Sequence, residues 1–176
     1  MYCYEYPHPA VTTDCIIFGI DNEGLKVLLI ERGNDPYKGF WAFPGGFLNP
    51  DETVEQGALR ELNEETGLED AYIEEVGVFS DPGRDMRDRV ITVAFYSIIK
   101  IRNVKAGDDA ALAKWLPIKD LPKLAFDHDI ILEAALKRFR ERLAVAPDFL
   151  KNSKECFSEK EIETIENQMC RLLFSD

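Results

Sequence analysis

One sharply bounded helix, between residues 53 and 67, constrains the fold of this chain more than any other feature. Thr53 and Gln56 have the spacing of a capping box, which marks the start of a helix. Gly67 stands where a left-handed residue commonly ends one. Between these limits an apolar stripe recurs at helical spacing, formed by Val54, Ala58, Leu59 and Leu62. The pattern predicts a helix with one apolar side.

Runs of apolar and β-branched residues on both sides of this helix predict a sheet. The predicted strands cover residues 10–20, 25–30, 72–79 and 89–101. Residues 21–24, of turn-forming type, join the first two strands into a hairpin. Residues 40–47 predict a short extended piece, residues 110–115 a short strand or helix, and residues 127–144 a second long helix. Strands mixed with helices in this way indicate an α/β layered domain.

The segment from residue 145 onward differs in composition and is richer in charge and serine. Ser158 and Glu161 form a second capping box, which predicts a third helix. We therefore divide the chain into a domain at residues 8–144 and a C-terminal helical tail at residues 145–176. The tail helix is a candidate surface for forming a homodimer.

The charge of the chain limits the classes of function open to it. The net charge is −12, from 33 acidic and 21 basic side chains, which gives no overall support for binding nucleic-acid phosphates. No secretory signal and no apolar run long enough to span a bilayer are found. The four cysteines form no CxxC pair and are expected to be reduced thiols. We expect a cytoplasmic protein whose partners are neither nucleic acid nor membrane.

More than half of the excess negative charge lies between residues 51 and 70. Glu61, Glu64 and Glu65 are spaced so that their carboxylates share one face of the predicted helix, and like charges there repel. Arg60 is the only basic residue in the stretch. Two interpretations are open: a solvated acidic surface, or a site for Mg²⁺ or Mn²⁺, which prefer oxygen ligands.

The flanking residues favour a site, because residues 46–68 resemble the Nudix box of the Nudix hydrolases at every defined position. That box is a Gly, five residues, a Glu, seven residues, and then Arg-Glu-apolar-x-Glu-Glu-x-Gly-apolar. The matching residues are Gly46, Glu52, Arg60, Glu61, Leu62, Glu64, Glu65, Gly67 and Leu68. The resemblance implies the Nudix fold, an α/β/α sandwich around a mixed β-sheet, followed here by the helical tail.

The resemblance also implies catalytic roles within the box. Glu61 and Glu65 would be the principal ligands of Mg²⁺, for which Mn²⁺ could substitute, with Glu64 as a supporting ligand. Glu52 would be a further acidic member of the catalytic group, and Arg60 would hold the glutamates in place by ion pairing. The implied reaction is the metal-dependent hydrolysis of the pyrophosphate bond in a nucleoside diphosphate linked to another group.

Two glycines and a later loop carry the implied contacts to substrate. Gly45 and Gly46 would let the backbone approach the metal and the phosphates closely. Pro82 and its loop resemble the ADP-ribose pyrophosphatase branch of the family, which implies hydrolysis of ADP-ribose to AMP and ribose 5-phosphate. Arg84 and Arg87 would then bind the phosphates, unless they pair with neighbouring aspartates on the surface.

Three further positions leave alternatives open. Trp41 either stacks on the adenine or packs in the core. Leu112 stands where relatives usually carry a Glu, so the general base is not assigned. Asp108 or Asp109 could supply the carboxylate in place of that Glu. His128 is expected to serve in helix capping at the surface rather than as a ligand.

A second hypothesis is a catalytically weak sensor. Residues 125–143 and the loop at residues 80–85 also resemble the Nudix domain of transcriptional regulators of NAD metabolism, which bind ADP-ribose-like ligands. Those regulators carry a winged-helix DNA-binding domain, for which residues 145–176 are too short. The intact box favours the enzyme over the sensor.

Overall fold

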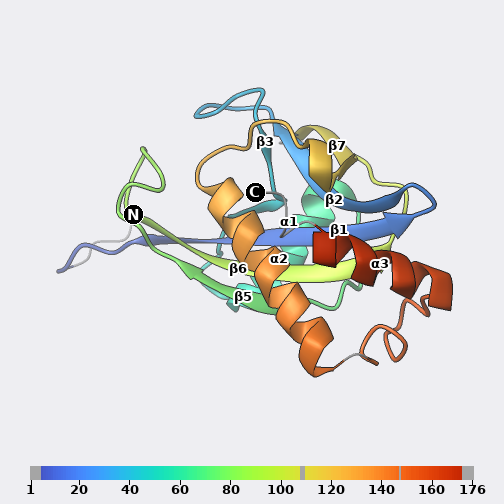
Figure 1. Cartoon of the computed structure of the whole chain (residues 1–176). Coiled ribbons are helices and arrows are strands. Elements are labelled where there is room, and N and C mark those ends of the chain that lie inside the picture. Colours follow the sequence, from blue (N-terminus) through green and yellow to red (C-terminus); the bar gives the residue numbers. More distant parts are fainter. Residues whose placement is uncertain (1–4, 108–109, 147, 172–176) are drawn as a thin grey trace.

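The computed structural model describes residues 5–107, 110–146 and 148–171, and a seven-stranded mixed sheet lies at its centre (Figure 1). The strands are β1 (Ala10–Asp21), β2 (Gly24–Arg32), β3 (Trp41–Ala42), β4 (Gly45–Phe47), β5 (Glu74–Phe79), β6 (Val90–Lys100) and β7 (Ala110–Pro117). The helices are α1 (Val54–Thr66), α2 (His128–Val145), α3 (Glu159–Arg171) and the short 3-10 helix η1 (Ile118–Asp120). The predicted hairpin and long helices are confirmed, and the segment from residue 110 is a strand.

The first strand, β1, has a divided edge. Along its other edge β1 pairs in parallel with β6, from Ala10 to Ile20. On the divided edge, residues 12–14 pair with β4 and residues 18–21 pair with β2, both antiparallel. This division brings the Gly45–Gly46 pair directly beside Thr13 and Asp14 and opens a space between β4 and the end of β2.

Helices cover both faces of the sheet, and Figure 1 shows α2 and α3 in front of it and α1 behind it. Side chains of a strand alternate between its faces, so Cys15 and Ile17 pack against α1 while Ile16 and Phe18 join the core under α2 and α3. The ring of Phe18 stacks on that of Phe139 in α2, with 5.5 Å between centroids. The expected α/β/α sandwich is confirmed.

The helix of the tail, α3, belongs to the main hydrophobic core. Its capping box is formed as predicted: the Ser158 amide donates to Glu161 Oε2 (2.6 Å), and the Glu161 amide donates to Ser158 Oγ (3.3 Å). Ile165 and Met169 are fully buried in the same cluster as Phe18. The apolar side of α3 is therefore covered within the chain itself. None of the helices described is long and apolar enough to cross a membrane.

Candidate functional site

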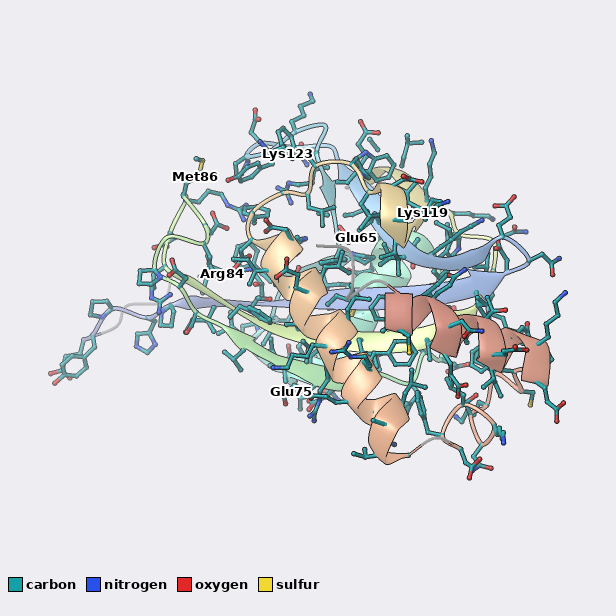
Figure 2. The ribbon with its side chains drawn as sticks, viewed as in Figure 1. Glu65, Glu75, Arg84, Met86, Lys119 and Lys123 are labelled. Carbon is teal, nitrogen blue, oxygen red and sulfur yellow. The ribbon has the colours of Figure 1, made fainter. Side chains whose placement is uncertain are left out.

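A cavity of about 400 Å³ lies at the division of the sheet. Its walls come from β1, the end of β2, strand β4, the carboxylate side of α1, the loop before β6 and the start of α2. Figure 2 shows Glu65 and Arg84 near the N-terminal end of α2, and both line this cavity. Met86, at the outer tip of the loop, points into solvent (Figure 2).

Two glutamates of α1 line the cavity beside the two glycines. Glu65 Oε2 accepts a hydrogen bond of 2.9 Å from the Gly45 amide. A Cβ atom at position 46 would lie 2.4 Å from Glu61 Oε1, and one at position 45 would lie 2.0 Å from the Thr13 carbonyl oxygen. A side chain at position 45 would therefore collide with the backbone of β1, and one at position 46 would displace the Glu61 carboxylate.

Arg60 binds the remaining glutamates of the box. Its Nε and Nη2 donate to the two carboxylate oxygens of Glu52, at 3.0 and 2.6 Å. Its Nη1 donates to Glu61 Oε1 (2.8 Å) and to Glu64 Oε2 (2.9 Å), and its Nη2 also reaches the Phe47 carbonyl oxygen. These bonds to Arg60 lower the pKa of Glu52 to about 2. Glu52 and Glu64 do not line the cavity; both bind Arg60, which does, and Glu52 also accepts from the amide of Asn49 in the cavity wall (2.7 Å).

The protein does not fully balance the negative charge that the two cavity glutamates carry when they are ionised. Burial, with the nearby charges of Glu61 and Asp14, raises the pKa of Glu65 to about 8, against the Gly45 hydrogen bond. Burial also raises the pKa of Glu61, despite its bond to Arg60. A cation beside these carboxylates would favour their ionised forms.

The donor set fits a hard divalent ion that brings its own ligands. In the described ranges no three His, Cys, Asp or Glu side chains form a ready cage for a metal. Mg²⁺ commonly uses only one or two carboxylates and completes its shell with water and substrate phosphates. Glu61 and Glu65, with the close approach that Gly46 allows, meet that requirement.

The opposite side of the cavity is basic and aromatic. The Arg32 guanidinium lies 4.9 Å from the centre of the Phe126 ring, and that of Arg87 lies 5.5 Å from it. Arg87 also lies 5.6 Å from the Phe47 ring, and Asp85 holds it through Nη2 at 2.6 Å. Burial, together with the like charge of Arg87, lowers the pKa of Arg32. This side of the cavity is therefore suited to an anionic group and a flat ring.

Arg84 lines the same cavity but is held by protein carboxylates. Its Nε and Nη2 donate to the two oxygens of Asp127, at 3.0 and 2.8 Å. Its Nη2 also lies 3.8 Å from Asp14 Oδ2, which accepts a 2.6 Å hydrogen bond from the Thr92 hydroxyl. Arg84 thus sits in the interior between two aspartates of distant segments, and its ion pair is not the predicted one with neighbouring aspartates on the surface.

The prediction that His128 lies at the surface is wrong. The residue is 4% exposed, and its Nδ1 accepts a hydrogen bond of 3.0 Å from the Phe43 amide. Its Nε2 lies 3.5 Å from Asp14 Oδ1. The sequence suggested a surface position because helix starts are commonly exposed, but α2 begins against the segment that joins β3 to β4. Asp127, the N-cap, forms no side-chain capping bond because its carboxylate binds Arg84.

The structure separates two other predicted substrate residues from the cavity. Trp41 packs against the hydrophobic core, and Pro82 is exposed on its loop; neither lines the cavity. Leu112 is exposed on β7, and the alternatives Asp108 and Asp109 lie outside the described residues.

Three cavity residues escaped the sequence reasoning. Asp14 is a carboxylate inside an apolar strand, which is a signal that could have found it. Arg32 ends a predicted strand, and Phe126 precedes the second helix, and neither position carries a local signal.

Comparison with known proteins decides the family. The family described as NUDIX domain matches residues 8–139, which covers the box, the divided sheet and most of α2. The chain belongs to the Nudix hydrolases. An ADP-ribose pyrophosphatase of Methanocaldococcus jannaschii is 46% identical to this Nudix chain over 128 residues, which are 73% of each of the two chains.

Nudix regulators are also similar to this chain. The ADPR responsive transcriptional repressor NtrR of Acinetobacter baylyi is 34% identical over 143 residues, covering 78% of this chain and 57% of the repressor. The NUDIX domain of Shewanella oneidensis NrtR, solved in complex with ADP ribose, has a TM-score of 0.72 and 34% identity. That match covers 76% of this chain and 90% of the solved one. This Nudix chain therefore resembles both enzymes and regulators.

Proposed function

We propose that this Nudix hydrolase cleaves the pyrophosphate bond of ADP-ribose to give AMP and ribose 5-phosphate. One observation carries the proposal: a single cavity is lined by two half-buried carboxylates and by guanidinium groups with an aromatic ring. Its volume of about 400 Å³ is in the range of small-molecule sites. The likeness to an ADP-ribose pyrophosphatase supports the choice of substrate.

In this proposal Glu61 and Glu65 hold a divalent cation, Mg²⁺ first and Mn²⁺ as a substitute. The ion would neutralise charge on the pyrophosphate and polarise the attacking water. Arg60 fixes Glu61 and Glu64 on the same side of α1, so Glu64 contributes as a supporting member and Glu52 through its two bonds to Arg60. The missing side chains of Gly45 and Gly46 let β1 and the Glu61 carboxylate lie close against this part of the backbone.

The basic side of the cavity binds the rest of the substrate. Arg87 and Arg32 attract the second phosphate, and Phe126 supplies the flat surface for a ring that was predicted for Trp41. The water oxygen bonds to one phosphorus, and the bridging oxygen leaves with the other phosphate. The proton released by the water passes to a basic oxygen of the site or to solvent.

The test is a panel of nucleoside diphosphate derivatives with Mg²⁺, with Mn²⁺ and with chelator, followed by identification of products. We expect ADP-ribose to be hydrolysed with either ion, to give AMP and ribose 5-phosphate, and to be stable with chelator. If another derivative is hydrolysed with a much higher kcat/KM, that derivative and not ADP-ribose is the substrate. A lack of turnover across the panel would contradict the enzyme proposal.

A sensor is the second candidate, favoured by the likeness to NtrR and NrtR and by Leu112, which replaces the usual Glu. Calorimetric titration with ADP-ribose in the absence of metal separates the two. Tight binding without turnover in the presence of metal supports the sensor. Turnover of the bound ligand once Mg²⁺ is added supports the enzyme.

A further inference from the structure

The segment from Trp41 to Gly45 leads to the carboxylate side of the cavity. Three of its backbone groups form hydrogen bonds with residues outside β1. The Trp41 carbonyl oxygen accepts from the Ala125 amide (2.8 Å), and the Phe43 amide donates to His128 Nδ1 (3.0 Å). The Gly45 amide then donates to Glu65 Oε2 (2.9 Å). The chain bends at Pro44, between the end of β3 and the start of β4. The three bonds are made by alternate residues on either side of this bend, and they form a row along the chain that ends on the cavity glutamate.

The middle bond of this row differs in kind. Trp41 is bonded to a backbone amide, that of Ala125. Phe43 instead lies beside His128, where α2 begins, and its amide is bonded to a side-chain acceptor. Phe43 is 1% exposed, so its amide has no access to solvent water as a replacement. Without an acceptor at this point the amide would be buried and unsatisfied, which is costly.

The ring of His128 is fixed from several sides. It lies parallel to the Phe43 ring, with 5.0 Å between centroids and 7° between planes. Because Nδ1 accepts a hydrogen bond, the proton of the neutral ring is on Nε2, which faces Asp14 Oδ1 at 3.5 Å. Asp14 is held in turn by the Thr92 hydroxyl. Burial lowers the pKa of His128 and so favours this neutral form.

We infer that His128 is a positioning residue, whose Nδ1 fixes Phe43 and thereby sets the Gly45 amide against Glu65. The inference rests on the proposed function only for its activity readout. Because Gly45 and Glu65 belong to the carboxylate side and not to the arginine side, the loss of this acceptor acts on kcat more than on KM. Small displacements of reacting groups are enough for large losses of rate.

Two substitutions at this position separate the acceptor from the ring. The carbonyl oxygen of Asn stands the same number of bonds from Cβ as Nδ1, so His128→Asn keeps an acceptor for the Phe43 amide. The amide of Gln extends one bond further, so His128→Gln misplaces that acceptor. Leu136→Ala, about two turns further along α2 than His128, is the control for general loss of packing.

The first measurement is hydrogen exchange at the Phe43 and Gly45 amides in the metal-free protein. We expect exchange at both to accelerate by about tenfold or more in His128→Gln, to stay near the parent rate in His128→Asn, and to change in Leu136→Ala only as far as global stability does. Unchanged Gly45 exchange in a folded His128→Gln variant would overturn the inference.

The second measurement is steady-state hydrolysis. We expect His128→Gln to lower kcat by about tenfold or more with KM within about threefold, and His128→Asn to restore most of the rate. An equal loss in Asn, Gln and Leu136→Ala variants would reduce His128 to a packing residue. If the parent hydrolyses no substrate, the proposed function fails, while hydrogen exchange still decides the inference. If His128→Gln does not fold, the test rests on the exchange rates and the kcat of His128→Asn. Values for this variant that differ widely from those of the parent would overturn the inference.

Discussion

Arg84 and Asp127 are joined by two hydrogen bonds, of 3.0 and 2.8 Å, across 43 residues of sequence. The side chain of Arg84 is 4% exposed and that of Asp127 is 15% exposed, so the pair is shielded from solvent. The loop before β6 is thereby tied to the start of α2 at the edge of the cavity. Arg84 fixes the loop, and Arg87 remains directed to the aromatic side.

Asp127→Asn should lower the free energy of unfolding by about 3 kcal/mol, because it leaves the buried Arg84 charge without its bidentate partner. Urea denaturation of the metal-free protein measures this change. Glu141→Gln removes a carboxylate from an exposed pair with Arg138 in the same helix and should change stability by less than about 1 kcal/mol. Equal effects of the two substitutions would show that the Arg84–Asp127 pair contributes nothing special.

Glu65→Gln should reduce hydrolysis by more than about a hundredfold while the far-ultraviolet circular dichroism stays that of the parent. The substitution removes the charge proposed to hold the cation, a larger change than the loss of an outer partner of a metal ligand. Glu55→Gln, on the same helix and exposed, serves as the control and should leave turnover unchanged. Full activity of the Glu65 variant would remove this residue from the metal assignment.

The stability of the metal-free protein should depend on pH through Glu65. The folded group titrates at about 8 and the unfolded group near 4.5, so the unfolded state loses its proton first as the pH rises. Stability that this group contributes below pH 4.5 is therefore lost as the pH rises toward 8. The pKa of His128 is lowered by burial, so this group makes the protein more stable as the pH rises. The contribution of Glu65 to the pH dependence of stability is therefore obtained as the difference between the parent and Glu65→Gln.

Thermal unfolding across this window, with and without Mg²⁺, is the measurement. Added Mg²⁺ should raise the Tm of the parent more at pH 8 than at pH 5, since an ion bound to the ionised carboxylates offsets their burial. The Glu65→Gln variant should lose most of this difference. A Mg²⁺ effect that is the same at both pH values would argue against cation binding at Glu65.

Arg87→Met should raise KM for ADP-ribose by about tenfold with kcat little changed. The guanidinium contacts the Phe126 and Phe47 rings and pairs with Asp85, not with Glu61 or Glu65, so its loss weakens binding rather than the chemical step. Arg89→Met, in the same loop and outside the cavity lining, is the matched control. A fall in kcat at constant KM would instead give Arg87 a part in the chemical step.

Local patterns predicted the parts of this protein that are determined by neighbours in sequence. The capping box, the apolar stripe and Gly67 delimit α1 from within a single segment, and Gly67 has the expected left-handed conformation (φ 71°). The side-by-side placement of Glu61 and Glu65 follows from helical spacing alone. These features need no information about the rest of the chain.

Contacts between distant segments could not be obtained in this way. The bond between Phe43 and His128 spans 85 residues, and it depends on where α2 begins relative to the β3–β4 segment. Asp14 and Arg32 enter the cavity because β4 and β2 share one edge of β1, which no local pattern encodes. The wrong surface prediction for His128 has the same cause, namely contacts between segments that are distant in sequence. The position of Trp41 against the core, outside the cavity, has this cause too.

The divided edge of β1 separates two tasks that evolution can alter independently. The glycine pair is attached to β1, a central strand with a buried middle, so the geometry around the carboxylates is inherited with the core. The loop before β6 and the turn at Phe126 reach the cavity from its other side and carry Arg87 and the aromatic ring. Substitutions in the loop before β6 and in the turn at Phe126 could therefore change the preferred ligand, while the glycine pair and the carboxylates stay unchanged.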